Sequence, residues 1–100
     1  MKTPITLTNL QKYVKKRDNK KNKKMDYFMK FIEEVGELSE MIKKEKKLDS
    51  EDGRTKAIKN TMDEEIADVL YYLAVLANVN GIDLEEAFVR KMEYNEKNNK

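Results

Sequence analysis

Apolar residues recur at intervals of three and four positions along most of the chain, and no segment of useful length alternates between apolar and polar residues. Intervals of three and four place side chains on one face of an α-helix. Only one proline and three glycines interrupt the pattern. We therefore expect an all-α protein, a four-helix bundle-like domain, with helices over Thr8 to Arg17, Lys24 to Lys47 and Lys56 to Asn80 and a fourth that starts at Asp83.

Cap and turn residues mark the ends of these predicted helices. Thr8 is the expected N-cap of the first helix, and Gly81 fits the position where a left-handed residue ends the third. Asp83 is followed three residues later by a glutamate, the spacing of a capping box, which predicts the start of the fourth helix. The basic run 15–24 is predicted to be a loop or a frayed helix end, and the segment 48–54, which contains Asp, Ser and Gly, is predicted to be a turn.

The predicted helices differ in how much of their surface is apolar. The second helix has a single apolar stripe, made of Phe28, Phe31, Ile32, Val35, Leu38 and Ile42. The fourth helix is expected to turn its apolar residues inward, namely Leu84, Ala87, Phe88 and Met92. From Ile66 to Val79 the third helix is apolar nearly all round, so it must be covered on several faces. Since a chain of this length buries only part of its apolar surface alone, we expect a homodimer or homotetramer assembled through this shared helix.

The composition limits the chemistry available to the chain. One hundred residues correspond to a single domain, 1–100, with an N-terminal helix and basic loop over 1–23 and a core motif region over 24–97. The chain has no Cys and no His, which excludes disulfides, thiolate nucleophiles, imidazole bases and imidazole ligands. Catalysis would therefore depend on carboxylates, Lys, Tyr or a metal held by oxygen atoms.

Charge and targeting signals indicate the setting in which the chain acts. The 21 Lys and Arg against 19 Asp and Glu leave a formal charge of +2, typical of a surface rich in ion pairs rather than of a polyanion binder. The basic run 15–24 contains no aromatic residue to stack bases, so nucleic-acid binding is not favoured. The first ten residues show no signal-peptide pattern, and the longest apolar stretch, about 14 residues, is too short to cross a bilayer. We expect a cytoplasmic protein without a membrane partner.

Two acidic segments lie beside strongly apolar residues. Glu34 and Glu37 are three positions apart, about 60° on a helical wheel, and Glu65 and Asp68 repeat that spacing. If the second and third helices pack side by side, four carboxylates converge at the edge of the core. Carboxylates brought together repel one another and lose hydration, so they need a counter-charge. A divalent cation is the simplest one, and the lack of His favours Mg²⁺ or Mn²⁺ over redox iron.

These acidic residues and their surroundings resemble a known family. Glu33-Glu34-x-x-Glu37 followed by Glu65-x-x-Asp68 is similar to the EExxE…ExxD motif of the MazG-like all-α nucleoside triphosphate pyrophosphohydrolases, which are related to dCTP pyrophosphatase. The surrounding segments EEVGELSE and EEIADVLYYLAVLA resemble that family's second and third helices. The fourth helix adds a Lys-x-x-x-Asn element like the family's C-terminal one, so that the resemblance covers residues 24–97.

The resemblance implies Mg²⁺-dependent hydrolysis, with Mn²⁺ as a substitute, of a nucleoside or deoxynucleoside triphosphate between its α and β phosphates. The products would be the monophosphate and pyrophosphate. The site residues implied by match of position are the metal ligands Glu34, Glu37, Glu65 and Asp68, with Glu33 supporting them or activating water, Lys91 and Asn95 at the phosphates and Tyr72 at the nucleobase. Some relatives use a Trp near the base; this chain has none, so base preference does not carry over.

An alternative from a different functional class is a non-enzymatic helical module that dimerises through the third helix. Its acidic pairs would be structural surface acids, paired with lysines such as Lys30, Lys43 and Lys44. This hypothesis accounts for the apolar third helix, but it does not account for Asp68 within an apolar run. Only the hydrolase should bind Mg²⁺ and lose that binding in Glu37→Gln or Asp68→Asn.

Overall fold

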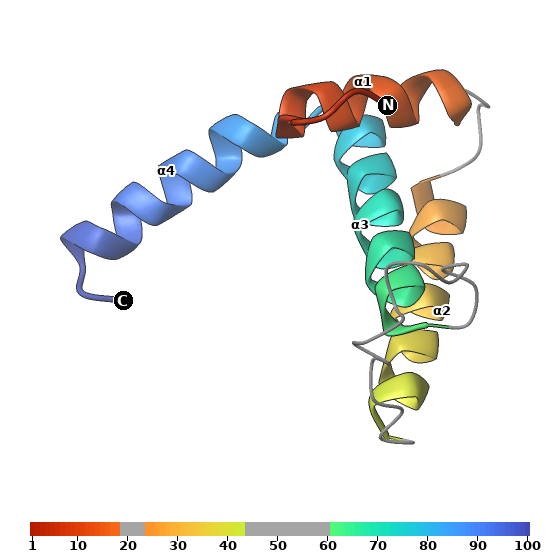
Figure 1. Ribbon diagram of the computed structural model, residues 1–100. Helices are drawn as coiled ribbons and strands as arrows, with labels where there is room; N and C mark the ends of the chain where they lie inside the picture. Colours follow the sequence, from red (N-terminus) through yellow and green to blue (C-terminus); the bar gives the residue numbers. More distant parts are fainter. Residues whose placement is uncertain (19–23, 44–60) are drawn as a thin grey trace. The chain divides into compact units, whose positions relative to one another are not determined.

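The computed structural model describes residues 1–18, 24–43 and 61–100, which form α-helices and no strand (Figure 1). The helices in these ranges are α1 (Leu7–Arg17), α2 (Lys24–Lys43), α3 (Met62–Val79) and α4 (Leu84–Lys97). The all-α prediction is confirmed. The chain forms two compact units, one of residues 1–21 and 74–100 and one of residues 22–73, so that α3 contributes to both.

The start of α1 differs from the prediction, whereas its end at Arg17 is as predicted. Thr6, not Thr8, is the N-cap, because the Oγ1 atom of Thr6 accepts a 3.0 Å hydrogen bond from the N–H of Asn9. The last turn contains three basic residues, 15–17, which are helical, as the predicted helix had them, although they also begin the basic run that was predicted to be a loop or a frayed end. Their charges lie at the negative end of the helix dipole, where cations are favoured. The rest of the predicted loop, 19–23, lies outside the described residues.

The junction of α3 and α4 has the predicted geometry. Gly81 has φ 66°, and its N–H donates to the carbonyl of Asn78 while the N–H of Ile82 donates to the carbonyl of Ala77, at 3.2 and 2.8 Å. This pair of bonds is a Schellman motif, which ends a helix on a left-handed residue. Asp83 then caps α4, since its side chain accepts a 3.0 Å hydrogen bond from the N–H three residues further on. Both predicted boundaries are confirmed.

The start of α3 differs from the prediction. Thr61 is not helical, and its Oγ1 accepts a 3.2 Å hydrogen bond from the N–H of Glu64, as the side chain of an N-cap does. Within the described residues α3 therefore begins after Thr61, and the part of the predicted helix over 56–60 lies outside them. The predicted end of the second helix near Lys47 and the predicted turn 48–54 lie outside the described residues.

In the unit of residues 1–21 and 74–100, α1 packs against α4 and the last turns of α3. The buried side chains are Leu10 and Val14 of α1 and Ala74, Val75 and Ala77 of α3. Gln11 ties the helices together: its Nε2 donates to Oδ1 of Asn78 at 3.0 Å and to the carbonyl of Ile82 at 2.8 Å, and its Oε1 accepts from the N–H of Leu84 at 2.8 Å. One amide side chain thus fixes α1 against the α3–α4 turn.

In the unit of residues 22–73, α2 and the first turns of α3 run side by side (Figure 1). The buried residues of α2 are Tyr27 and Glu34, which are seven positions apart and therefore share one face. The predicted burial of the apolar stripe is wrong for four of its members, Phe28, Ile32, Val35 and Ile42, which are exposed. The reason is geometric, because α2 turns the face of Tyr27 and Glu34 toward α3 and the stripe lies on the adjacent face.

Apolar side chains are also exposed on the other long helices. Ile66, Leu70 and Leu73 of α3 are exposed, whereas the predicted all-round apolar segment is buried only in its later turns. α4 has no buried residue, and Phe88 is 58% exposed, so the prediction that Phe88 and Ala87 turn inward is wrong within one chain. None of the described helices combines the length and hydropathy needed to cross a bilayer.

Candidate metal centre

Five carboxylates from two facing helices come together in the unit of residues 22–73. One group consists of Glu33, Glu34 and Glu37 of α2, and the other of Glu34 with Glu65 and Asp68 of α3. Within each group, one carboxylate oxygen per residue lies within 4.8 Å of the others. The two groups share Glu34, so the predicted convergence of the acids on the second and third helices is found in the structure.

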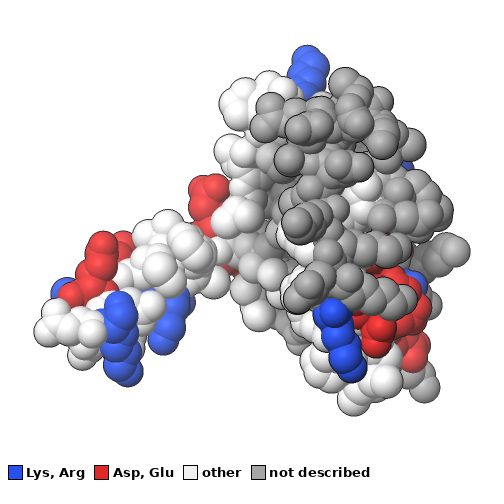
Figure 2. Space-filling view, turned by 60° about the horizontal axis from the view of Figure 1, so that its bottom comes forward, with Lys and Arg blue, Asp and Glu red and all other residues white. Residues whose placement is uncertain are grey.

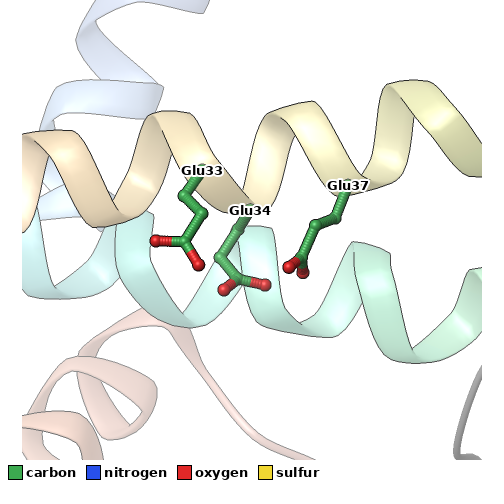
Figure 3. Close-up of side chains that lie close together, drawn as sticks. All are labelled: Glu33, Glu34 and Glu37. Atoms are coloured by element: carbon green, nitrogen blue, oxygen red, sulfur yellow. The ribbon is translucent and has the colours of Figure 1, made fainter.

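The α2 carboxylates point to the side of the helix along which α3 runs (Figure 3). Spacings of one and three positions place them on neighbouring parts of the helix surface, which explains why a short sequence segment supplies three of them. Glu34 is only 5% exposed, Glu65 and Asp68 are half-buried, and Glu33 and Glu37 are exposed. The cluster therefore runs from a buried carboxylate at the helix–helix contact to carboxylates in contact with solvent.

Acidic and basic side chains are distributed differently over the described helices. Acidic side chains gather on the α2–α3 part of the surface with basic side chains at the edge, whereas α4 carries both signs along its length (Figure 2). The overall charge of the chain is nearly balanced, at +2. The gathering of carboxylates on α2 and α3 is thus a property of the local arrangement and not of the composition.

The carboxylates perturb one another. The pKa of Glu37 is raised, first by the negative charge of Glu34 and then by a hydrogen bond with the Glu34 side chain. The pKa of Glu65 is also raised, first by burial and then by the negative charges of Glu34 and Asp68. Both shifts mean that the folded chain holds these protons more tightly than an isolated carboxyl does, chiefly through like charge at Glu37 and chiefly through burial at Glu65.

Lys30 supplies part of that counter-charge. Its Nζ lies 3.2 Å from Oε2 of Glu34 and 3.4 Å from Oε1 of Glu33, one turn further along α2. The same ammonium lies 5.6 Å from the ring centroid of Tyr72 on α3, a cation–π contact. The pKa of Lys30 is raised above its ordinary value of 10.5, chiefly by the hydrogen bond to Glu34.

The donor set fits a hard divalent cation. All five side chains offer carboxylate oxygens, the donors that Mg²⁺, Mn²⁺ and Ca²⁺ prefer. Among the described residues, the Oε2 atom of Glu65 is a buried side-chain oxygen without a hydrogen-bond partner. Leaving such an oxygen unsatisfied is costly, and a cation beside it would remove the cost. The site can therefore accept a metal without displacing a hydrogen bond from that atom.

The remaining predicted site residues are described within their own units. The ring of Tyr72 contacts the ammonium of Lys30, which in turn pairs with the cluster. The same ring packs edge-on against Tyr71, with the ring centroids 5.1 Å apart. Lys91 and Asn95 lie one turn apart on α4, in the unit of residues 1–21 and 74–100. The ammonium of Lys91 lies 4.9 Å from the ring centroid of Tyr94, and the carbonyl of Asn95 accepts hydrogen bonds at the end of the helix.

Sequence reasoning did not single out Lys30. It treated this lysine as one of several that pair with surface acids, although its spacing of four residues from Glu34 was visible. A Lys four positions from a Glu on a helix is common and usually solvated. Only the burial of Glu34 and the position of Tyr72 distinguish this pair, and neither can be read from the spacing.

Comparison with known proteins agrees with the fold and with the acidic motif. Residues 23–99 match the family described as MazG nucleotide pyrophosphohydrolase domain. Two crystal structures of iMazG from Vibrio DAT 722 match the chain with a TM-score of 0.75 each. The Ntag form is 39% identical and the match covers 94% of this chain and 97% of that one; the Ctag form is 40% identical, with 92% and 99% covered.

A comparison with curated proteins gave no match. The family match nevertheless extends over most of the chain and includes both acidic segments, and the structural matches span nearly the whole length of each protein. The fold, the paired carboxylates and the matched length agree with one another. The chain belongs to the MazG nucleotide pyrophosphohydrolase family.

Proposed function

We propose that the chain hydrolyses a nucleoside or deoxynucleoside triphosphate between the α and β phosphates, with Mg²⁺ as cofactor and Mn²⁺ as a possible substitute. The family is one of nucleotide pyrophosphohydrolases. The observation that carries the proposal for this chain is the pair of carboxylate groups that share the buried Glu34, beside an unsatisfied buried oxygen of Glu65. A scaffold of surface acids would not require a buried carboxylate at a helix–helix contact.

In this proposal Glu34, Glu37, Glu65 and Asp68 hold the cation. A bound Mg²⁺ supplies positive charge that offsets the charge of the phosphates and lowers the pKa of water nearby. Glu33 is exposed beside this group, and we assign to its carboxylate the proton released by the attacking water. The water oxygen forms a bond to phosphorus, the bond of the α–β anhydride breaks, and pyrophosphate leaves with the shared electron pair.

Three further residues orient the substrate in this proposal. Lys91 and Asn95 share one face of α4 and are assigned to the phosphates, where an ammonium and an amide donate hydrogen bonds. Tyr72 is assigned to the nucleobase, because an aromatic ring offers a stacking surface at low conformational cost. These three assignments rest on the match of position to the family motif and not on a contact with substrate.

We also propose that the chain assembles as a homodimer or homotetramer. The support is the number of large apolar side chains that one chain leaves exposed, including Phe28 and Ile32 of α2, Ile66 of α3 and Phe88 of α4. Scattered exposed apolar residues are ordinary, but whole apolar helix faces favour association. The mass in solution, measured by light scattering, tests the assembly independently of activity.

The experiment that tests the reaction is pyrophosphate release from a panel of NTPs and dNTPs with Mg²⁺ or Mn²⁺. We expect release to require the cation and to fall by about 100-fold or more in Asp68→Asn, because the substitution removes a charged ligand from the site. Asp63→Asn is the matched control, the same change at an exposed position of the same helix, and should retain activity. If no nucleotide is cleaved and calorimetry detects no Mg²⁺ binding, the non-enzymatic helical module becomes the better hypothesis.

A further inference from the structure

The ammonium of Lys30 contacts two carboxylates of the cluster, the exposed Glu33 and the buried Glu34. It bridges Glu33 and Glu34 on α2, at 3.4 and 3.2 Å, and faces the ring of Tyr72 on α3, 5.6 Å from the centroid. The Lys30 side chain is 39% exposed, whereas the Glu34 side chain is 7% exposed. The pair therefore joins a buried carboxylate to a lysine whose long stem still reaches solvent.

This arrangement brings a positive charge to the cluster. When ionised, Glu33, Glu34, Glu37, Glu65 and Asp68 carry five negative charges, and the Lys30 ammonium beside Glu33 and Glu34 offsets part of this charge. Glu34 is the carboxylate that belongs to both potential ligand groups. A cation that binds either group therefore approaches the carboxylate with which Lys30 is already paired.

We propose that Lys30 is a resident counter-ion that competes with the divalent cation for Glu34 and so lowers the cation affinity of the site. The inference rests on the proposed function, since it concerns the same carboxylates. Without a cation, the ammonium offsets part of the repulsion among the acids. When a divalent cation binds, it and the ammonium share one carboxylate, and the flexible lysine stem lets the ammonium withdraw toward solvent.

Calorimetric titration of Mg²⁺ into the full chain, at one ionic strength and without nucleotide, tests this competition. Lys30→Met removes the charge but keeps the apolar stem, and we expect the Mg²⁺ dissociation constant to fall roughly three- to tenfold, as Coulomb attraction without the competing charge predicts. Lys30→Arg keeps the charge and should bind Mg²⁺ within about twofold of the unaltered chain. Lys43→Met is the matched control, with the same loss of charge at the far end of α2, and should also bind within about twofold.

A thermal melt provides a second readout that does not depend on activity. In cation-free buffer Lys30→Met should melt at a lower temperature than the unaltered chain, because the acids have lost their counter-ion. Saturating Mg²⁺ should raise its melting temperature by more than that of the unaltered chain. If Lys30→Met is unfolded without cation, recovery of a cooperative melt on Mg²⁺ addition supports the same competition.

Two results would overturn the inference, and they differ in what they say about the proposed function. If the unaltered chain binds Mg²⁺ and Lys30→Met binds it equally or more weakly, Lys30 is not a competitor and the proposed function stands. If the unaltered chain does not bind Mg²⁺ at all, the proposed metal centre fails together with the inference.

Discussion

Glu34 is the residue through which the two carboxylate groups are connected. It is buried, paired with Lys30, and close enough to Glu37 and Glu65 to raise the pKa of each. A buried carboxylate with one ion pair and several like charges around it is an unfavourable arrangement for stability alone. Buried charges of this kind are found at functional sites, and the function that we propose for this one is cation binding.

The raised pKa values of Glu37 and Glu65 predict how stability depends on pH without a cation. Because the folded chain binds these two protons more tightly than the unfolded chain, the folded state carries more protons above the ordinary carboxyl pKa of 4.5. The contribution of these two carboxyls to the free energy of unfolding therefore falls as the pH rises from 4.5 through their raised values. We expect urea unfolding in cation-free buffer to show this loss on going from pH 4.5 to pH 7.

The variant Glu37→Gln with Glu65→Gln isolates that contribution, since neither amide titrates. It should lose less stability over the same pH interval than the unaltered chain. Saturating Mg²⁺ should restore stability to the unaltered chain at the upper pH but not to the variant, because the cation offsets the charge of the ionised carboxylates, two of which the variant lacks. Identical pH profiles for the two proteins would show that these carboxyls are not coupled in the folded state.

Single residues were predictable where local spacing determines their position. The three-residue intervals within 33–37 and 65–68 placed the acids on adjacent faces, and the structure brings them together. Lys30 was not predictable, because its importance depends on which face of α2 turns toward α3. The packing of the whole unit determines which face of α2 contacts α3. The apolar stripe of α2 predicted a different face from the one that is buried, which carries Tyr27 and Glu34.

At the scale of the element, helix ends were predicted best where a special backbone conformation is needed. Gly81 and Asp83 were correctly placed because a left-handed residue followed by a cap leaves few alternatives. The start of α1 was missed by two residues, since Thr6 and Thr8 are both competent caps and only the hydrogen bond to Asn9 distinguishes them. Helix ends with several equivalent caps remain ambiguous at the level of sequence.

Two glycines provide a matched test of the element ends. Gly81 has φ +66° with nothing within 4 Å of an added Cβ, so Gly81→Ala introduces strain without a clash and should lower the free energy of unfolding by about 1–2 kcal/mol. Gly36 lies inside α2 with equally open surroundings, so Gly36→Ala should raise it by about 0.5–1 kcal/mol through helix propensity. Urea denaturation measures both, and equal effects of the two substitutions would refute the assigned role of Gly81.

At the scale of the whole molecule, the remaining question is what covers the apolar faces. Phe28, Ile32 and Ile42 of α2 and Ile66 and Leu70 of α3 are exposed in one chain, although their spacing predicts a buried stripe. The exposure in one chain and the apolar spacing are compatible if the stripe contacts a second copy of the chain. Apolar periodicity is expected for side chains buried between subunits as well as for those buried within one chain. Sequence periodicity cannot separate the two kinds of burial.

Phe88→Lys tests assembly without altering the carboxylates. Phe88 is the most exposed aromatic residue of α4 at 58%, and a charge placed on an apolar contact is costly to bury, so we expect a lower oligomeric state by light scattering at equal concentration. Asn9→Lys adds the same charge at an exposed position of α1 and should leave the mass unchanged. If Phe88→Lys keeps the mass of the unaltered chain, α4 does not contribute to the interface. A monomeric unaltered chain would instead exclude the assembly, and the apolar faces of α2 and α3 would then need another partner.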